Sequence, residues 1–494
     1  MLEREVKLAA PRGFRLLDLG GVADDIVVTA APERRFTTVY WDTADLRLIR
    51  WGSTLRHRAD EGWTVKLPMG GSSRGMLTRA EHVFAGSQKQ PPSEALDLVS
   101  AYLRGAAVSR VARMRTVRRV LSVRGVEGAQ LAEIDDDDVT VLDGRRVAAR
   151  FREIEVELAE GAPEQLLHAL VDHLVAAGAE QPDPMPKLVR ALGARSAEPP
   201  DVAVDALPRH ARGGAVVRRA IAASAQRLIK HDAVVRIGAD PEGVHQARVA
   251  TRRLRSDLRT FAPLLDRQWA DALRTELQWL ADELGVVRDG DVLLMRLRDT
   301  AAELDPQDAH AVDAVIAELA ADVERERARL LDGMRDARYF ALLDHLVAAA
   351  RQPALTAEAE RPAVLVLPQL VQRPWRRLRR AQRALSDPPV DEELHAVRIL
   401  AKRLRYAAEA VGPVVGRRAS ALAGAAAGVQ EVLGDLHDAV VAADWLRAHV
   451  GSDPARAFAT GELFAMEMAK AAEQRTLWPN AWRKLDRPKL RSWM

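Results

Sequence analysis

Residues 1–8 of the chain read MLEREVKL, in which Glu3, Glu5 and Lys7 occupy every second position. A β-strand sends residues i and i+2 to the same face, so two carboxylates and an ammonium group would share one face of this strand. Such a face can be buried only if other charges lie against it. Because carboxylate oxygens suit Mg²⁺ or Mn²⁺ and lysine suits phosphate, the stretch predicts a strand that faces a divalent cation and a phosphate chain.

The same alternation of charge recurs along the first third of the chain. It is found at Arg56 and Arg58, at Lys66, at Arg79 and Glu81, at Arg113 and Arg115, at Glu133, Asp135 and Asp137, and at Glu153, Glu155 and Glu157. For any one row, an exposed strand with a solvated polar face is the alternative. Rows of like charge along one face cost free energy unless they are countered. A closed barrel with a charged lumen explains all the rows together.

Four consecutive aspartates, residues 135–138, complicate one of these rows. Strand alternation sends only two of the four inward. Parity with Glu133 favours Asp135 and Asp137 as the inward pair.

The composition limits the class of protein. The chain has 494 residues, 73 Lys+Arg against 70 Asp+Glu, and a net charge of +3, so we expect two or three domains and local rather than global charge. It has no cysteine, which excludes disulfides, thiolate metal sites and cysteine catalysis. The chain opens on alternating charge and has no apolar run of bilayer length, so we expect no signal peptide, no membrane span and a cytoplasmic location.

The pattern of the chain changes near residue 200. Residues 1–197 consist mostly of short alternating segments separated by turn residues, residues 198–206 form a polar, proline-containing linker, and residues 207–494 have helical periodicity throughout. We therefore expect an α+β protein of two domains. The first would be an antiparallel β-barrel tunnel with a charged lumen, and the second an all-α bundle.

An internal repeat organises the helical part. The segment HQARVATRRLR (245–255) returns as HAVRILAKRLR (395–405), and LGVVRD (284–289) returns as LGDLHD (433–438). Two segments in the same order at nearly the same spacing predict a duplicated helical bundle with pseudo-twofold symmetry.

Each repeat begins with a basic stripe. Steps of three and four residues keep side chains on one helix face, and they connect His245, Arg248, Arg252, Arg255 and Arg259, and then His395, Arg398, Lys402 and Arg405. A row of like charges destabilises a helix by about 0.2–0.5 kcal/mol per pair, which an extended polyanion would offset. Acids from neighbouring helices are the alternative. No second histidine or cysteine stands at ligand spacing within either stripe, so a phosphate-binding or a structural histidine is favoured over a metal ligand. Asp289 and Asp438 are predicted to have structural roles.

The first domain resembles the CYTH superfamily, the triphosphate tunnel metalloenzymes. The resemblance rests on the charge rows above and on Pro186-Lys187-Leu188, which is similar to the family's late lysine motif. It implies metal-dependent hydrolysis of tripolyphosphate by in-line attack of water. It also implies that Mg²⁺ or Mn²⁺ is held by Glu3, Glu5, Glu155 and Glu157 with Asp135 or Asp137. The phosphates would be held by Lys7, Arg56, Arg58, Lys66, Arg115 and Lys187, with Arg79 and Arg113 as weaker candidates.

The second domain resembles the CHAD family, the conserved histidine α-helical domain, on its two His-led stripes and its two Leu-Gly-x-x-x-Asp segments. The resemblance implies binding of inorganic polyphosphate. The implied residues are His245, Arg248, Arg252, Arg253, Arg255, Arg259, Arg376, Arg380, His395, Arg398, Lys402, Arg403 and Arg405. Lys402 departs from the first repeat, where the equivalent residue is Arg252, and a lysine binds phosphate as a point charge.

Several alternatives stay open at this point. The CYTH superfamily also contains adenylate cyclases and thiamine triphosphatases, and the tunnel motifs leave the organic end of the substrate undefined. A protein with a silent barrel that docks on polyphosphate granules is a second possibility. Basic helices bind nucleic acid non-specifically at low salt, but we find no base-reading motif, and only 4% of residues are aromatic. The sequence does not define the oligomeric state.

Overall fold

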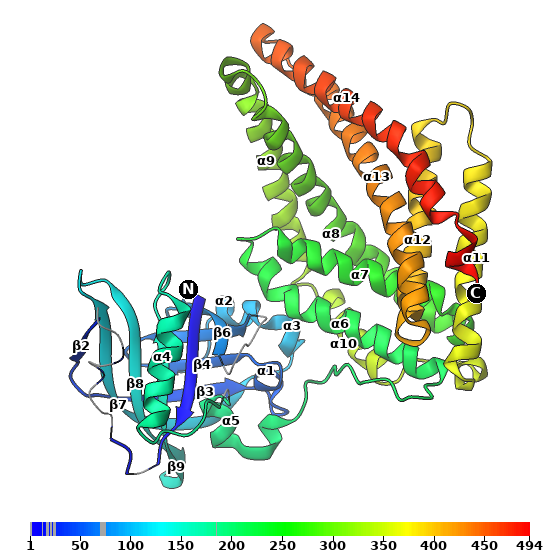
Figure 1. Cartoon of the computed structure of the whole chain (residues 1–494). Helices are drawn as coiled ribbons and strands as arrows, with labels where there is room; N and C mark the ends of the chain where they lie inside the picture. The colour runs from blue at the N-terminus through cyan, green and yellow to red at the C-terminus, as the bar shows by residue number, and fades with distance from the viewer. Residues whose placement is uncertain are drawn as a thin grey trace. The chain divides into compact units, whose positions relative to one another are not determined.

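The computed structural model describes residues 2–11, 13–15, 19, 22, 26–69, 76–183 and 185–494, without the side chains of residues 2 and 3. The chain divides into two compact units, Met1–Asp201 and Val202–Met494, which are considered separately below (Figure 1). Within the described residues, no helix combines the length and the apolar character needed to cross a membrane.

The first unit is built around a closed antiparallel sheet. Its described strands are β1 (Leu2–Ala9), β2 (Ile26–Ala30), β3 (Arg34–Asp42), β4 (Thr54–Arg58), β5 (Gly62–Pro68), β6 (Met76–Phe84), β7 (Ser109–Gly125), β8 (Gln130–Asp143) and β9 (Arg146–Leu158). The order is β7-β3-β4-β5-β6-β1-β9-β8, and β8 pairs again with β7 to close the barrel. β2 pairs with the end of β7 that lies beyond the β3 pairing.

The register of the barrel decides which side chains share its lumen. Glu5 lies opposite Glu157, and Lys7 lies opposite Glu155, across the β1–β9 pair. Asp135 also lies opposite Glu155 across the β8–β9 pair. Because directly paired residues point to the same side of a sheet, these charges from three strands converge inside the barrel.

Most apolar residues of β1 and β9 point outward and are covered by α4 (Glu164–Ala176). Leu167 and Leu170 of this amphipathic helix are fully buried against a cluster that includes Leu8, Ile154 and Val156. Burial of each leucine side chain contributes about 1.5–3 kcal/mol. The outer face of these strands thus carries one apolar core, whereas a smaller cluster that includes Met114 and Val139 lies on the same face as the charged residues.

Short helices complete the first unit. They are α1 (Arg47–Arg50), α2 (Ser93–Leu98), α3 (Ser100–Leu103), α5 (Lys187–Leu192) and the 3₁₀ helix η1 (Gly193–Ala197). α5 begins at Lys187, so this lysine stands at the first helical position.

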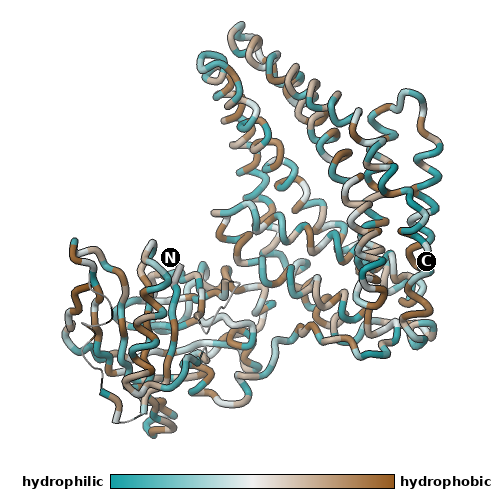
Figure 2. The backbone as a smooth tube through the Cα atoms, in the orientation of Figure 1, coloured by the Kyte–Doolittle hydropathy of each residue, from teal (hydrophilic) through white to brown (hydrophobic). Residues whose placement is uncertain are grey.

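The second unit is entirely helical in the described residues. Its helices are α6 (Gly213–Ile237), α7 (Glu242–Thr260), η2 (Ala262–Leu264), α8 (Arg267–Ala301), α9 (Pro306–Gly333), α10 (Ala337–Arg351), η3 (Ala357–Glu360), α11 (Ala363–Arg383), α12 (Asp391–Val415), α13 (Arg417–Ala448), α14 (Pro454–Leu485) and η4 (Pro488–Arg491). Hydrophilic and hydrophobic residues alternate along these helices, as expected for amphipathic packing (Figure 2).

Glycines set two of the tightest points in this unit. α6 passes so close to α7 that a Cβ atom at Gly243 would lie only 2.8 Å from the backbone of Val234. Gly416, at φ 74°, reverses the chain between α12 and α13 in a conformation that other residues adopt at a cost. The α7–α8 and α12–α13 pairs carry the two copies of the repeat, and the predicted fold of a barrel followed by a helical bundle is confirmed.

Candidate functional site

One end of the lumen is organised around Lys7. Its Nζ lies 2.9 Å from Glu5 Oε2, forms an ion pair with Glu155 and lies 3.9 Å from Glu153 Oε1. All four side chains are buried, and Glu153 is 0% exposed. Buried charges are tolerated only when they are paired, and here one ammonium group serves several carboxylates.

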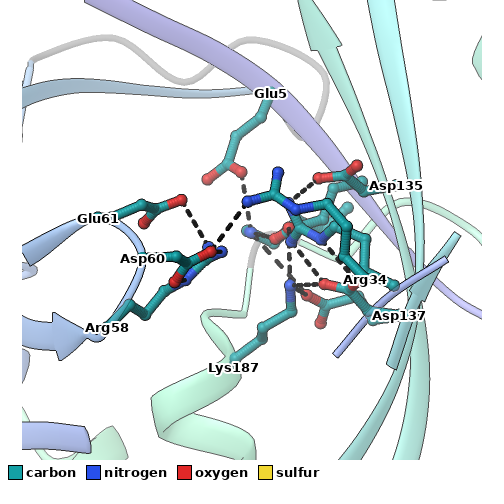
Figure 3. Close-up of polar contacts among 12 residues, drawn as sticks. Glu5, Arg34, Arg58, Asp60, Glu61, Asp135, Asp137 and Lys187 are labelled. Carbon is teal, nitrogen blue, oxygen red and sulfur yellow. Dashed lines mark hydrogen bonds and ion pairs between the residues drawn. The ribbon is translucent and has the colours of Figure 1, made fainter. Parts of the chain in front are cut away.

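Arg118 and Lys187 hold a second group of carboxylates. Arg118 of β7 forms an ion pair with Asp135, and it lies 2.6 Å from Asp137 and 3.2 Å from Glu155. Lys187, at the start of α5, pairs with Asp137 and lies 2.7 Å from Glu155 Oε2. Figure 3 shows Lys187 and Asp137 pointing toward each other, with Glu5 directed into the same group of side chains. Two cations therefore face the acidic strands β8 and β9.

The opposite wall of the lumen is basic with fewer acids. Lys66 Nζ lies 3.1 Å from Glu81 Oε2, and Arg56 lies 3.7 Å from the other oxygen of Glu81. Arg58 is 2% exposed, pairs with Asp60 at 2.9 Å, and its guanidinium carbon lies 3.6 Å from the centre of the Phe36 ring. A cavity of about 40 Å³ remains between the two walls, lined by residues such as Lys7, Arg56, Lys66, Arg79 and Lys187.

The acids of the lumen differ in their proton affinity. Burial alone would raise the pKa of Glu5, but the charges of Lys7, Lys66 and Arg79 lower it to about 2. Asp137 is buried as well, yet Lys187 and Arg118 hold its pKa well below the usual range.

Asp135 behaves in the opposite way. Its burial, together with the neighbouring Asp137 and Glu133 carboxylates, raises its pKa to about 6 against the influence of Arg118. The lumen therefore contains both firmly ionised carboxylates and one that is close to neutralisation, and one more positive charge beside Asp135 would restore its ionised form.

The carboxylate oxygens suit a divalent cation by their chemistry, since Mg²⁺ and Mn²⁺ prefer hard oxygen ligands. Glu5 Oε1, Asp135 Oδ1 and both carboxylate oxygens of Glu153 are buried without a hydrogen-bond partner. Across the described residues, however, no three acidic or histidine side chains already converge on one point, because lysine and arginine lie between them. The donor set fits a divalent cation, and the cations of the lumen would have to shift to admit one.

Two of the predicted metal ligands have less definite positions. The side chain of Glu3 lies outside the described residues, and only its backbone pairing with Arg79 is defined. Glu157 is half-buried and lies opposite Glu5 in the register of β1 and β9.

The predicted position of Arg115 in the lumen is wrong. Arg115 pairs with Thr37 and Thr140 on the outer face of the barrel, and its side chain is exposed, as is that of Arg113. The inward residues of β7 have even numbers, and Arg118 lies opposite Asp137. A shift of one residue along a strand exchanges its two faces, and the sequence RMRTVRR (113–119) contains arginines of both parities.

Sequence reasoning also missed other lumen residues. Glu153 was noted only as part of an acidic row, yet it lies within 3.9 Å of Lys7 and within 3.5 Å of Arg190. Asp136 points to the outer face, where Arg152 pairs with it at 2.7 Å. The strand register reveals the position of Glu153, whereas the outward direction of Asp136 agrees with the alternation expected along the aspartate run.

In the second unit, the first three members of each basic stripe line one cavity. This first cavity, of about 480 Å³, lies between α7, α8, α12 and α13. Both copies of the repeat contribute to it, and its polar lining consists of His245, Arg248, Arg252, Arg288, Asp289, Arg296, His395, Arg398, Lys402, His437 and Asp438. The sequence predicted two separate stripes, and the packing of the helices brings them together.

The Gly-x-x-x-Asp segments have a structural explanation. Gly434 leaves room for Arg398, whose Nε lies 3.5 Å from the position of a Cβ atom there, and the guanidinium group lies 3.9 Å from Asp438 one turn later. The first repeat is equivalent, since Arg248 passes Gly285 and lies 2.6 Å from Asp289. The glycine and the aspartate thus position one arginine of each stripe.

Positive charge is crowded in the first cavity. Burial, and then the charges of Arg252, Arg398 and Arg248, lower the pKa of Lys402 to about 7. The Nδ1 atoms of His395 and His437 lie 3.2 Å apart, and burial lowers the pKa of both rings. His437 stands where the first repeat has Arg288, 42 residues from His395, so no local spacing could indicate this contact.

The remaining predicted phosphate ligands fall into four groups. A second cavity of about 600 Å³ is lined by Arg253 and Arg405, both of which pair with Glu409. Arg255 does not line this cavity and donates a hydrogen bond to Gln278. A third cavity contains Arg259 and Arg403. Arg376 and Arg380 are exposed on α11 and line none of the three cavities, whereas Arg373 and Arg377 of the same helix line the third.

Comparison with known proteins gives matches over nearly the whole chain. The model of the CYTH domain matches residues 1–184, and that of the CHAD domain matches residues 219–447. "Uncharacterized protein Rv2226" of Mycobacterium tuberculosis is 34% identical over 94% of this chain and 93% of its own length. Among solved structures, PptA from Streptomyces chartreusis is 25% identical, with a TM-score of 0.47, over 55% of this chain and all of that one. The CHAD domain of the plant Ricinus communis has the same identity and TM-score over 57% of this chain and 95% of that one.

Proposed function

We propose that this chain, which belongs to the family of proteins joining a CYTH triphosphate-tunnel domain to a CHAD domain, hydrolyses inorganic tripolyphosphate or a related triphosphate in its barrel and binds polyphosphate on its helical unit. CYTH domains are generally metal-dependent. The observation that carries the proposal is the closed lumen, in which buried carboxylate oxygens without hydrogen-bond partners lie beside lysines and arginines.

The two walls of the lumen suit different parts of this task. The acidic wall would hold Mg²⁺ or Mn²⁺ through Glu5, Asp135, Asp137, Glu155 and Glu157. Such an ion would neutralise phosphate charge and lower the pKa of a bound water.

The cations of the lumen supply the phosphate ligands. Lys66 and Arg56 on the basic wall share Glu81, and Lys7 and Lys187 border the same cavity. When phosphate oxygens replace the carboxylates as partners of these cations, the positive charges lie along the substrate. Preorganised cations of this kind stabilise charge on a transferring phosphoryl group without reorganising solvent. No side-chain nucleophile is required.

The helical unit would act by charge alone. In its first cavity, Arg248 and Arg398 are oriented by aspartates, while Arg252 and Lys402 face one another across the repeat. An extended inorganic polyphosphate would relieve this repulsion, and the cavity supplies donors from both repeats.

The test is release of orthophosphate from tripolyphosphate by the full chain with Mg²⁺ or Mn²⁺. Glu5→Gln keeps the shape of the side chain and removes its charge. Glu127→Gln is the matched control, because Glu127 is exposed in the turn between β7 and β8. We expect metal-dependent release that Glu5→Gln abolishes and Glu127→Gln retains. Release of pyrophosphate from ATP would instead indicate a cyclase, and loss of the terminal phosphate from thiamine triphosphate alone would indicate an organic triphosphatase.

A second candidate function is favoured by one observation. Glu5, Asp137 and Glu155 are already paired with lysine or arginine, and no three described acids of the lumen converge on one point. A barrel fixed in this arrangement would be silent, and the chain would dock on polyphosphate granules through its helical unit. Polyphosphate binding without phosphate release under either metal would support this function.

A further inference from the structure

The third cavity of the helical unit differs from the other two in its lining. It has a volume of about 390 Å³ and lies where the end of α7 meets α8, α11 and α12. Five guanidinium groups line it, from Arg259, Arg274, Arg373, Arg377 and Arg403.

Among the residues that the structure describes, no acidic side chain lines this cavity. Arg274 pairs with Asp271, 2.8 Å away, while its Nε atom is buried without a hydrogen-bond partner. For the other four arginines, no ion pair occurs among the residues that the structure describes. The first cavity, by contrast, contains Asp289 and Asp438. Apart from Asp271, no described acid of the unit therefore compensates the positive charge of the third cavity, and solvent reaches the exposed side chains of Arg259, Arg373 and Arg377.

The crowding has an electrostatic consequence at Arg259. Burial, followed by the charges of Arg403, Arg274, Arg255 and Arg377, lowers its pKa to about 10. Like charges held together in this way destabilise the folded unit, and an anion placed among them would offset that cost.

The rest of the lining is mostly apolar, with Ser256, Thr260 and Gln369 as its uncharged polar members. Pro263 and Ala262 form one side, and Leu370, Pro374 and Leu400 come from α11 and α12. An inorganic phosphate chain gains nothing from contact with such side chains. A ligand with a flat, weakly polar body and a phosphate end would use both parts of the lining, because guanidinium groups bind phosphate and also stack on planar rings. The volume falls within the range of about 300–1,000 Å³ that is typical of small-molecule sites.

We infer that the third cavity is a binding site for a nucleoside diphosphate, separate from the polyphosphate site and from the barrel lumen. The arginines would hold the phosphates, and the proline and leucine side chains would pack against the base. This assignment does not depend on the activity proposed for the barrel, and it can hold whether or not the barrel is active.

Equilibrium dialysis of radiolabelled ADP against the full chain at 150 mM salt tests this assignment. The double variant Arg377→Gln with Arg403→Gln should weaken binding at least about tenfold, as expected for loss of hydrogen bonds to charged groups. Arg376→Gln is the matched control, because Arg376 is the neighbour of Arg377 on α11 and lines none of the three cavities. Thermal unfolding of each variant, monitored by circular dichroism, establishes that it is folded.

Other results would overturn the inference. If inorganic pyrophosphate competes as strongly as ADP itself, the cavity is a site for bare phosphate rather than for a nucleotide. If Arg118→Gln abolishes ADP binding and the double variant does not, the nucleotide binds in the barrel lumen. Equal ADP binding by the wild type and the double variant would also exclude the third cavity.

Discussion

The barrel lumen and the first helical cavity both collect basic side chains, but they balance the charge differently. In the lumen, Arg118 has three carboxylate partners, which raise its pKa further despite burial. In the helical cavity, the neighbours of Lys402 are mostly cations, which lower its pKa to about 7. A site with both signs of charge in balance can bind a cation together with an anion, whereas a site in which positive charge predominates favours a polyanion. This difference suits chemistry in the barrel and retention in the bundle.

The largest expected effect tests the charge balance of the lumen. Asp137→Asn should lower the free energy of unfolding by about 3–5 kcal/mol, because Asp137 is 0% exposed and Arg118 and Lys187 would lose their shared partner. Hydrogen exchange of the β8 amides measures this loss. Asp135→Asn is the comparison, and we expect it to be close to neutral or stabilising at pH 7. Equal destabilisation by both substitutions would contradict the charge balance described here.

The sign of the pH dependence differs between the same two aspartates. The pKa of Asp137 is lowered on folding, so its contribution to stability is present above about pH 4 and is lost as the pH falls below that value. The pKa of Asp135 is raised to about 6, so its contribution is lost as the pH rises from about 4 to 6.

The next effect concerns the two faces of β7. Arg118→Gln should lower kcat/KM for tripolyphosphate by about 10²–10³-fold, the usual cost of removing one preorganised donor from a charged transition state. Arg115→Gln, on the outer face of the same strand, should change kcat/KM by less than about twofold. Initial rates of orthophosphate release measure both. The reverse result would mean that Arg115 contacts the substrate, and it would require a different register for β7.

The next prediction concerns how polyphosphate binding by the first helical cavity depends on pH. Lys402 is protonated below about pH 7, so we expect polyphosphate binding to weaken about tenfold between pH 6.5 and 8.5 as one charge-assisted interaction is lost. Lys402 faces Arg248, Arg252 and Arg398, together with Asp438. Burial, followed by neighbouring positive charges, lowers the pKa of the histidines of the cavity, which favours their neutral form.

Lys402→Arg separates this effect from a general loss of charge, because arginine stays protonated throughout the range. Binding by this variant, measured by calorimetry, should be nearly independent of pH. A slope as steep as that of the wild type would assign the pH dependence to another group.

The smallest expected effect tests how far the polyphosphate-binding surface extends beyond the first helical cavity. The double variant Arg376→Gln with Arg380→Gln should weaken polyphosphate binding by less than about twofold, because exposed charges outside a cavity are screened by salt. Arg398→Gln, inside the first cavity, should weaken it about tenfold. Fluorescence anisotropy with labelled polyphosphate at 150 mM salt compares them. Similar losses would extend the binding surface onto the exposed face of α11.

Much of the architecture could be predicted from the sequence, because two patterns indicate it, the alternation of charge along strands and the repeat in the helical part. Charge at every second position in MLEREVKL and in the later rows indicated strands with one charged face, and the His-led repeat indicated a duplicated bundle. Alternation with Glu133 also indicated which aspartates face inward, and the structure places Asp135 and Asp137 in the lumen. These inferences need only local spacing.

The sequence by itself determined the class of each domain and the kinds of charge that each would collect. Only the tertiary structure decided that Arg118 rather than Arg115 enters the lumen, that His395 meets His437, and that Arg377 rather than Arg376 lines a cavity. The physical reason is the same in each case. Local spacing fixes which residues share a face, whereas the pairing of strands and the packing of helices fix which face is turned inward and what lies opposite.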